Sequence, residues 1–334
     1  MKFGPVEVRA AQGAVLAHSV GLGASGRLRK GRILTADDIE KLEHVGVAEV
    51  TVARLDADDV HEDAAAQALA NAFVPEPNAQ RLKLTEPFTG RVNLIAEGPG
   101  VVTLDASAIA AVNAVDPMIT IATVPDNQQM RDGGMVATIK IISYGVNAAA
   151  LQQACAKAKA CIELMPPKLM APRLIVSDIP GGVGDKGWRA TADRVAAFGL
   201  DLPPPVIVSH RVDDLAAAIA ASDGDLVMVL TGSATSDLAD VAPLAVLAAG
   251  GQVERFGMPV DPGNLLFLGR RAGVPIIGLP GCARAPALNG ADWVMGRIIC
   301  GVDVTGEDIA GMGVGGLLKE IPTRPQPRRG RDKT

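Results

Sequence analysis

A hydroxyl-rich segment, TGSATSDLAD (residues 231–240), directly follows the apolar run DLVMVL, which is typical of a buried strand. A glycine at the end of a strand lets a ligand approach the backbone closely, and Gly232 stands at that place. A carboxylate such as that of Asp240 can hold a divalent cation or orient a phosphate-bearing substrate. The side chains that offer hydroxyl groups to such a ligand are Thr231, Ser233, Thr235 and Ser236.

The same segment has a second interpretation, because Ser and Asp residues also cap helices. Ser236 or Asp237 would then satisfy free backbone N–H groups at the start of the next helix. For Asp237, capping is the favoured interpretation. Asp240 lies beyond the position expected for a cap, so we expect it to be catalytic and to bind a metal ion.

Three further loops, each after a predicted strand, are rich in Gly, Pro and small polar residues: PGGVGDKG (180–187), GMPVDPGN (257–264) and GLPGCARAP (278–286). Ligands of open α/β sheets bind at the carboxyl ends of the strands, so we expect all four loops to meet at one rim. In the first loop, Gly182, Gly184 and Asp185 precede a helix whose N–H groups can bind an anion. That loop lacks the spacing of common phosphate-binding motifs, and a plain flexible loop explains it equally well.

The positions of these loops depend on a regular alternation of strands and helices that begins at Arg173. The apolar runs are RLIVSD, PVIVS, DLVMVL, QVERFGM and PIIGL, with helical segments between them. Such alternation is typical of a mostly parallel sheet with helices on both faces. We therefore predict an α/β domain over residues 172–302, separated by the prolines of MPPKLMAPR from the residues before it.

The residues before this domain predict a smaller α+β region. Residues 1–75 read as a β/α unit, with a helix that begins after Thr35, a strand at 48–52 and a second helix in DVHEDAAAQALANAF. Residues 80–165 read as a module of short strands that ends in a helix over 148–164. Residues 303–321 form an extension, and the apolar-poor residues 322–334 form a flexible tail.

The composition restricts the possible partners. The chain has 334 residues, 48% of them hydrophobic, and a net charge of -5. Since binding to nucleic acid needs concentrated Lys and Arg, we expect small-molecule ligands instead. The N-terminus resembles no signal peptide, and no window reaches the ~18 apolar residues of a membrane span. We therefore expect a cytoplasmic protein that binds neither nucleic acid nor membranes.

Cysteine and histidine chemistry is not indicated. The chain has 4 Cys and 4 His, without a CxxC pair, and single scattered histidines are seldom metal ligands. Cys282 follows the LPG sequence, where we interpret it as a small residue in a tight loop and not as a nucleophile.

The loop sequences resemble those of the molybdopterin-binding domain of molybdenum-cofactor biosynthesis proteins. LTGSATSDLADV is similar to the family's TGG loop, FGMPVDPGN to its PGKP loop, and PIIGLPGCARAP to its GLPGNP turn, in the same order over residues 172–302. The resemblance implies a three-layer αβα fold that binds molybdopterin at the rim. It also implies, as in MogA-type and MoeA-type members, Mg2+-dependent adenylyl transfer from ATP or molybdate insertion.

Carried over to this chain, the resemblance assigns ligand contacts in three places. They are Thr231, Gly232 and Asp240; Pro262 and Gly263, with Asn264; and Gly278, Leu279, Pro280 and Gly281, with Cys282. The departures are Ser233 in place of a glycine, Asp261 and Asn264 in place of lysines, and Cys282 and Ala283 in place of the family's NP. Fewer cations at a site for an anionic pterin weaken catalysis more than binding.

The resemblance leaves three functions open. They are a transferase that acts on molybdopterin, a non-catalytic carrier or sensor of the cofactor, and a pyrophosphohydrolase similar to CinA. The motifs VDPGN, PGCAR and GMGVGGLL also resemble a subgroup in which a nucleotidyltransferase domain follows. The implied partners are a pterin and a nucleotide (ATP or AMP), other cofactor-biosynthesis proteins or molybdoenzymes, and further copies of the chain in a homo-oligomer.

Overall fold

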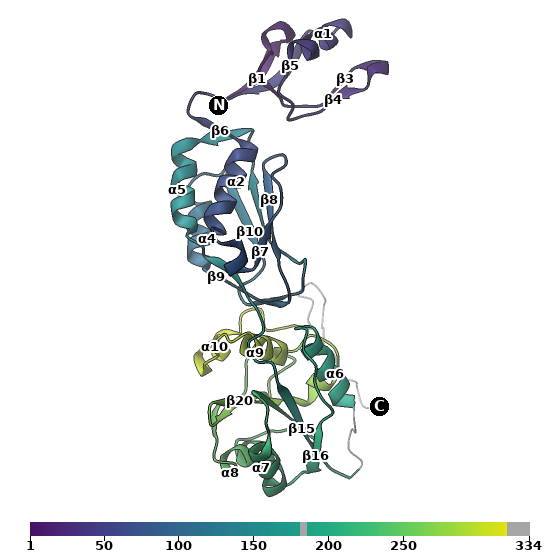
Figure 1. Cartoon of the computed structure of the whole chain (residues 1–334), viewed down its shortest axis with the longest axis vertical. Helices are drawn as coiled ribbons and strands as arrows, with labels where there is room; N and C mark the ends of the chain where they lie inside the picture. The colour runs from purple at the N-terminus through teal and green to yellow at the C-terminus, as the bar shows by residue number, and fades with distance from the viewer. Residues whose placement is uncertain (181–185, 319–334) are drawn as a thin grey trace, which may run out of the picture. The chain divides into compact units, whose positions relative to one another are not determined.

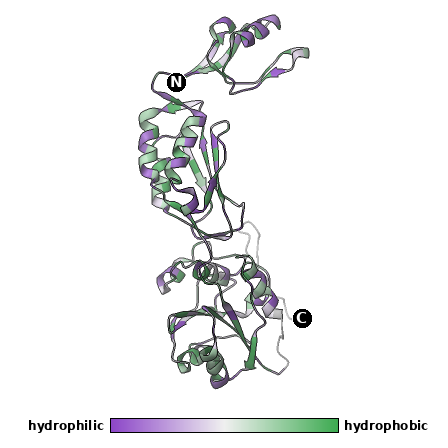
Figure 2. Ribbon diagram, in the orientation of Figure 1, coloured by the Kyte–Doolittle hydropathy of each residue, from purple (hydrophilic) through white to green (hydrophobic). Residues whose placement is uncertain are grey.

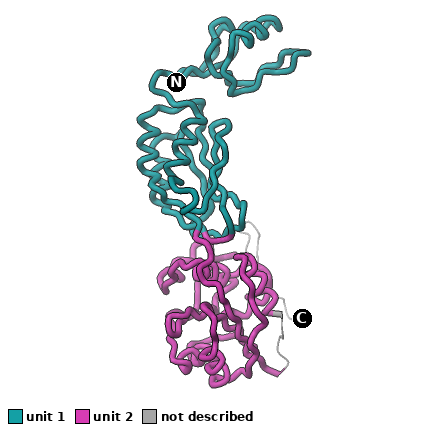
Figure 3. Tube along the Cα trace, in the orientation of Figure 1, with its two compact units in different colours: residues 1–98, 102–164 teal, residues 99–101, 165–334 magenta. Residues whose placement is uncertain are grey.

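The computed structural model describes residues 1–180 and 186–318 of the chain. These residues fall into two compact units (Figure 3). Unit 1 comprises residues 1–98 and 102–164, and unit 2 comprises residues 99–101 and those from Met165 onward. Along the described part of the chain, no helix combines the length and apolar character that crossing a membrane requires.

The described first half of the chain contains short strands, five α-helices and two 3-10 helices. The strands are β1 (Lys2–Glu7), β2 (Val15–Leu16), β3 (Val20–Gly21), β4 (Arg27–Leu28), β5 (Glu49–Arg54), β6 (Asp59–His61), β7 (Leu82–Leu84), β8 (Arg91–Ala96), β9 (Gly100–Leu104), β10 (Ile119–Thr123), β11 (Gln128–Met130), β12 (Met135–Ile141), β13 (Gly145–Asn147) and β14 (Ile162–Met165). The helices are η1 (Val8–Ala10), η2 (Gly23–Ser25), α1 (Ala36–His44), α2 (Glu62–Phe73), α3 (Pro77–Gln80), α4 (Ala106–Asn113) and α5 (Ala148–Ala158).

Unit 1 has the α+β character that the sequence predicts. The Thr35 side chain caps α1 and forms a capping box with Asp38. The strands form the sheets β1-β5-β2, β10-β12-β8-β7 and β11-β9-β14 and the two-stranded sheets β13-β6 and β3-β4. The helix α2 packs on β8 and β12. The helix predicted over 148–164 is too long: α5 ends at Ala158 because Lys159 and Ala160 adopt positive φ, and the chain then enters β14.

Unit 2 contains one six-stranded sheet in the order β16-β15-β17-β20-β19-β18. Figure 1 labels three of these strands, β15, β16 and β20. Its elements are β15 (Pro172–Asp178), α6 (Lys186–Ala196), β16 (Val206–Ser209), α7 (Val212–Ala221), β17 (Leu226–Thr231), α8 (Val241–Ala248), β18 (Gln252–Phe256), β19 (Phe267–Arg271), β20 (Val274–Leu279), η3 (Gly281–Arg284), α9 (Gly290–Ile299) and α10 (Gly306–Gly311). The first four strands in this order are parallel, as the sequence predicts. The sequence interpretation missed β19, which runs antiparallel to both of its neighbours.

Alternate residues of the unit 2 strands enter two separate cores. In β15, Leu174 and Val176 join the core that contains residues of α6 and α9, whereas Ile175 joins the core that contains residues of α7 and α8. Side chains of a strand point alternately to opposite faces, so helices cover both faces of the sheet. The helices α6, α7 and α9 carry both hydrophobic and hydrophilic residues (Figure 2), as expected where only one side is buried. The mixed α/β class predicted from the sequence is confirmed.

Candidate functional site

The register of the sheet brings the strand ends that precede the four loops to one edge. Phe256 lies opposite Phe267, and Phe267 opposite Gly278. Gly278 in turn lies opposite Val229, which lies opposite Ile175. Since β15, β17, β18 and β20 all run toward this edge, the residues that follow them emerge there together. We call this edge, made of residues 178–180, 231–240, 257–266 and 280–289, the rim.

The first predicted loop can be followed only in part. Asp178 is the last residue of β15, and Ile179 and Pro180 follow it at the rim. The candidates Gly182, Gly184 and Asp185 lie outside the described residues, and α6 begins immediately after them.

The TGS loop is held by its own hydroxyl groups. Thr231 is buried, and its hydroxyl donates to the carbonyl oxygen of Ser233 at 2.6 Å and lies 3.2 Å from that of Thr235. A Cβ on Gly232 would lie 2.9 Å from the carbonyl oxygen of Ser177, so only glycine fits this close approach. The hydroxyls of Thr231 and Thr235 therefore shape the loop, whereas Ser233 and Ser236 are exposed on the rim.

Asp240 is the N-cap of α8, contrary to the position expected from the sequence. One of its carboxylate oxygens accepts the N–H of Val241 at 2.7 Å, and the other accepts that of Ser236 at 3.0 Å. Asp237 instead accepts the N–H of Ala239 at 2.7 Å, in the turn before the helix. The helix starts later than expected because residues 236–240 form this turn first. Both carboxylate oxygens of Asp240 thus accept hydrogen bonds from backbone N–H groups.

The described residues do not supply a protein-only magnesium site. Nowhere in residues 1–180 or 186–318 do three or more His, Cys, Asp or Glu side chains gather closely enough to hold a metal ion. The predicted metal ligand Asp240 would contribute one carboxylate, and Mg2+ prefers octahedral coordination by several oxygens. This donor set does not fit a resident Mg2+ ion.

The PG loop is joined to the start of α9. A Cβ on Gly263, whose φ is +144°, would lie 2.9 Å from the amide nitrogen of Gly290. That amide donates to the carbonyl oxygen of Pro262 at 2.8 Å. The predicted contact residue Asn264 is exposed, and its amide lies 3.5 Å from the Met258 carbonyl of the same loop. Glycine is therefore required at 263 for packing between two rim segments.

The LPG turn contains both a core glycine and rim residues. Gly278 is buried within β20, where a Cβ would lie 2.0 Å from the ring of Phe267. Its lack of a side chain is explained by that ring, without a ligand. Cys282 is exposed and accepts a hydrogen bond from the Asn289 amide at 3.1 Å. Pro280 and Gly281 connect β20 to η3 at the rim.

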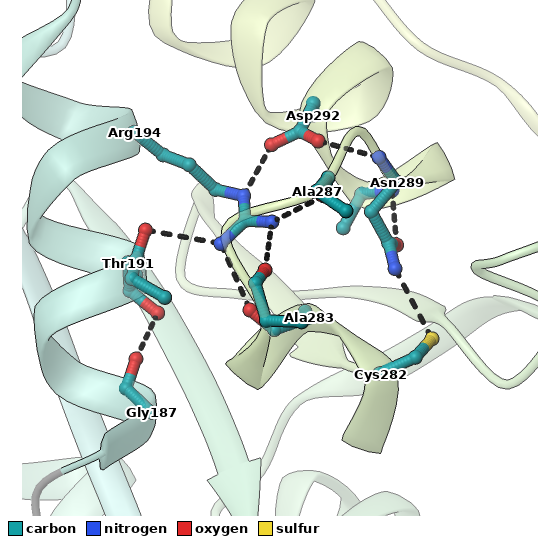
Figure 4. A network of polar contacts seen from close by, with 11 residues as sticks. Gly187, Thr191, Arg194, Cys282, Ala283, Ala287, Asn289 and Asp292 are labelled. Carbon is teal, nitrogen blue, oxygen red and sulfur yellow. Dashed lines mark hydrogen bonds and ion pairs between the residues drawn. The ribbon is translucent and has the colours of Figure 1, made fainter. Parts of the chain in front are cut away.

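Arg194 of α6 holds the segment after the LPG turn, a role that sequence reasoning missed. Its guanidinium pairs with Asp292 and donates to the carbonyl oxygens of Ala283, Ala285 and Ala287 at 2.8–3.0 Å (Figure 4). Arg194 lies three and seven residues after the buried Thr191 and Gly187. A charged residue one turn after Thr191 in the predicted helix, beside the apolar Val195, was the available signal.

A chain of polar contacts links the ends of three neighbouring strands. The hydroxyl of the buried Ser177 lies 2.8 Å from His210 Nδ1, and His210 Nε2 lies 3.4 Å from the hydroxyl of Ser233. Which atom donates depends on the imidazole tautomer. A groove of about 970 Å3 lies beside this chain and is lined in part by Asp178, His210 and Arg211. His210, interpreted from the sequence as an isolated histidine, thus lies beside the rim and contacts it through Ser233.

Comparisons with known proteins give the following similarities. Residues 5–54 match the family described as "Domain of unknown function (DUF8806)". No curated protein matches the chain. Among solved structures, the chain is similar to the molybdopterin biosynthesis MoeA protein from Pyrococcus horikosii, with 12% identity and a TM-score of 0.30 over 92% of this chain and 76% of that chain.

A second similar structure is a molybdenum cofactor biosynthesis protein from Pyrococcus furiosus. It has 12% identity and a TM-score of 0.22, and the match covers 84% of this chain and 56% of that chain. Both TM-scores lie below 0.5, and likenesses at this level do not establish a shared fold or activity.

Proposed function

We propose that unit 2 binds molybdopterin at the rim and that the protein serves molybdenum-cofactor biosynthesis. One observation carries this proposal. Three sequence segments that resemble molybdopterin-binding loops lie far apart in the chain, and the register of the sheet brings them to one edge. Within this proposal, residues 172–302 form a three-layer αβα domain of that family.

The chemistry of the rim suits a ligand with a phosphate group and a polar ring system. Gly232 packs closely against the backbone at Ser177, and Gly263 against the backbone at Gly290, so backbone segments from separate loops meet at this edge. Backbone N–H groups in such loops can bind phosphate oxygens. The exposed hydroxyls of Ser233 and Ser236 and the imidazole of His210 offer further hydrogen bonds to polar ring atoms.

Binding without turnover is the form of this function that the rim favours. Both carboxylate oxygens of Asp240 accept backbone N–H groups, so the proposed catalytic aspartate acts as a helix cap. In addition, Asp261 and Asn264 bring no positive charge to the PG loop. Transfer to or from molybdopterin, with Mg2+ and ATP, is the alternative that the sequence resemblance implies.

The test is an anaerobic titration of the full chain with molybdopterin, with mass spectrometry of ligand retained after purification. Ser233→Glu places a negative charge on the rim, whereas Gln252→Glu places the same charge at an exposed position at the opposite end of the sheet. We expect Ser233→Glu to weaken binding about tenfold or more, a loss of ~1.4 kcal/mol, and Gln252→Glu to change it less than twofold. The absence of saturable binding, or equal effects of both variants, contradicts the proposal. Release of pyrophosphate from ATP with Mg2+ and molybdopterin would support the transferase instead.

A further inference from the structure

Arg284, the last residue of η3, connects three segments at the rim. Its guanidinium donates to the carbonyl oxygen of Thr231 at the end of β17. A Cβ on Gly281 would lie 3.2 Å from its Nη1, and a Cβ on Gly187 would lie 3.2 Å from its Cγ. The side chain therefore crosses from the LPG turn, past the first turn of α6, to the TGS loop, and it is half-buried there.

The positive charge of Arg284 has no protein counter-charge among the described residues. No carboxylate of residues 1–180 or 186–318 lies within ion-pair distance of its guanidinium, and its buried Nε has no hydrogen-bond partner. Burial lowers the pKa of Arg284. Removing a charge from water without a partner costs free energy.

Three of the other arginines of unit 2 form close ion pairs, whereas Arg255 and Arg271 donate to the backbone carbonyl oxygens of Gly257 and Ala249. Arg173 binds Asp223, Arg194 binds Asp292, and Arg270 binds Glu254. Arg284 differs from them by lying at the rim, where the proposed ligand binds. A bound anion would supply the counter-charge that the described residues lack.

We infer that Arg284 binds the phosphate group of the rim ligand, which makes the ligand class a phosphate monoester. This inference rests on the proposed function. The planar guanidinium presents several N–H donors in a fixed arrangement that matches two phosphate oxygens at once. One of its nitrogens is already fixed by the Thr231 carbonyl oxygen, so the orientation is set before the ligand arrives.

The inference is tested on the full chain with inorganic phosphate as the probe, against chloride at equal ionic strength. Both tryptophans, Trp188 and Trp293, lie in unit 2, so their fluorescence reports its unfolding selectively. A ligand that binds only the folded state raises the unfolding midpoint. We expect phosphate to raise the midpoint of the wild-type protein and to leave that of Arg284→Met unchanged.

Arg271→Met is the matched control. Arg271 is also half-buried and donates to a backbone carbonyl oxygen, that of Ala249 at 2.7 Å, but it lies at the end of β19 remote from the rim. This variant should keep the full response to phosphate. Without phosphate, Arg284→Met should unfold at or above the wild-type midpoint, because it removes a half-buried charge that has no carboxylate partner among the described residues. A general structural role for Arg284 predicts a lower midpoint instead.

A second titration, with molybdopterin, separates this inference from the proposed function. Arg284→Met should weaken molybdopterin binding at least tenfold, and Arg284→Lys less, because an ammonium group keeps the charge without the planar pair of donors. Equal affinity of wild type and Arg284→Met overturns the inference and leaves the proposed function in place. A phosphate response that depends on Arg284, in a chain that binds no molybdopterin, supports the anion site and refutes the pterin. The same phosphate response in wild type and Arg284→Met overturns the anion site directly.

Discussion

Replacement of Arg194 by Met should destabilise unit 2 and release the segment after the LPG turn. The side chains of Arg194 and Asp292 are only 10% and 11% exposed. Removing one member of a buried ion pair leaves the other charge without compensation, at a cost of about 3–5 kcal/mol. Here the lower end applies, because the Asp292 carboxylate keeps the hydrogen bond from the Asn289 N–H at 2.7 Å.

The hydrogen bonds from Arg194 to backbone carbonyl oxygens contribute less to the stability of unit 2 than the ion pair does. Those of Ala285 and Ala287 lie in an exposed environment, so water can replace the lost donor. We therefore expect the free energy of unfolding to fall by about 3 kcal/mol, which corresponds to roughly 6–12 °C in Tm for a unit of this size. Met keeps most of the side-chain volume, so the loss reports the charge and its hydrogen bonds.

The assay is urea unfolding of the full chain followed by tryptophan fluorescence, which reports unit 2. A double-mutant cycle with Asp292→Asn isolates the pair, since Asn can still accept the Asn289 N–H. We expect a coupling energy above about 1 kcal/mol for Arg194 and Asp292. The control is Arg173→Met, whose partner Asp223 is 79% exposed, and its cost should stay within about 1 kcal/mol. A loss below that value for Arg194→Met, or a coupling energy near zero, refutes the reasoning.

Three further predictions follow from single contacts. Asp240→Ala should lower the free energy of unfolding of unit 2 by about 0.5–2 kcal/mol because α8 loses its cap, and Asp240→Asn should lower it less. Urea unfolding measures both losses, whereas a purely catalytic role for Asp240 predicts no loss of stability. Burial raises the pKa of Glu62, so wild-type stability falls as pH rises from the ordinary carboxyl range through the raised value. Glu62→Gln lacks this titration, so calorimetry should show its Tm rising relative to that of wild type over the same pH range. A Tm difference that does not change with pH would contradict this. Gly278→Ala should cost about 1–3 kcal/mol, because its methyl group would lie 2.0 Å from the buried Phe267 ring. Gly311→Ala has open space and should change stability little; equal effects of the two glycine variants would count against the packing argument.

Local sequence signals determined much of this fold. Thr35 and Asp38 are three residues apart, and their capping box forms within one turn of helix, so the start of α1 could be predicted. The alternation of apolar runs and helical segments likewise predicted the strands β15, β16, β17 and β20, because burial on both faces requires continuous apolar runs. The loops after these strands could therefore be assigned to one edge from the sequence alone.

Tertiary structure decided what these loops contact. The strand β19, FLGRR, carries two arginines and was missed because its pairing with β18 and β20 outweighs local preference. The cap of α8 passed to Asp240 because the turn before it uses Asp237. The partners of Arg194 and Arg284 lie up to 98 residues away in the chain, at distances that no local periodicity encodes. Whether a charge is paired or left for a ligand is determined by which segments meet at the rim.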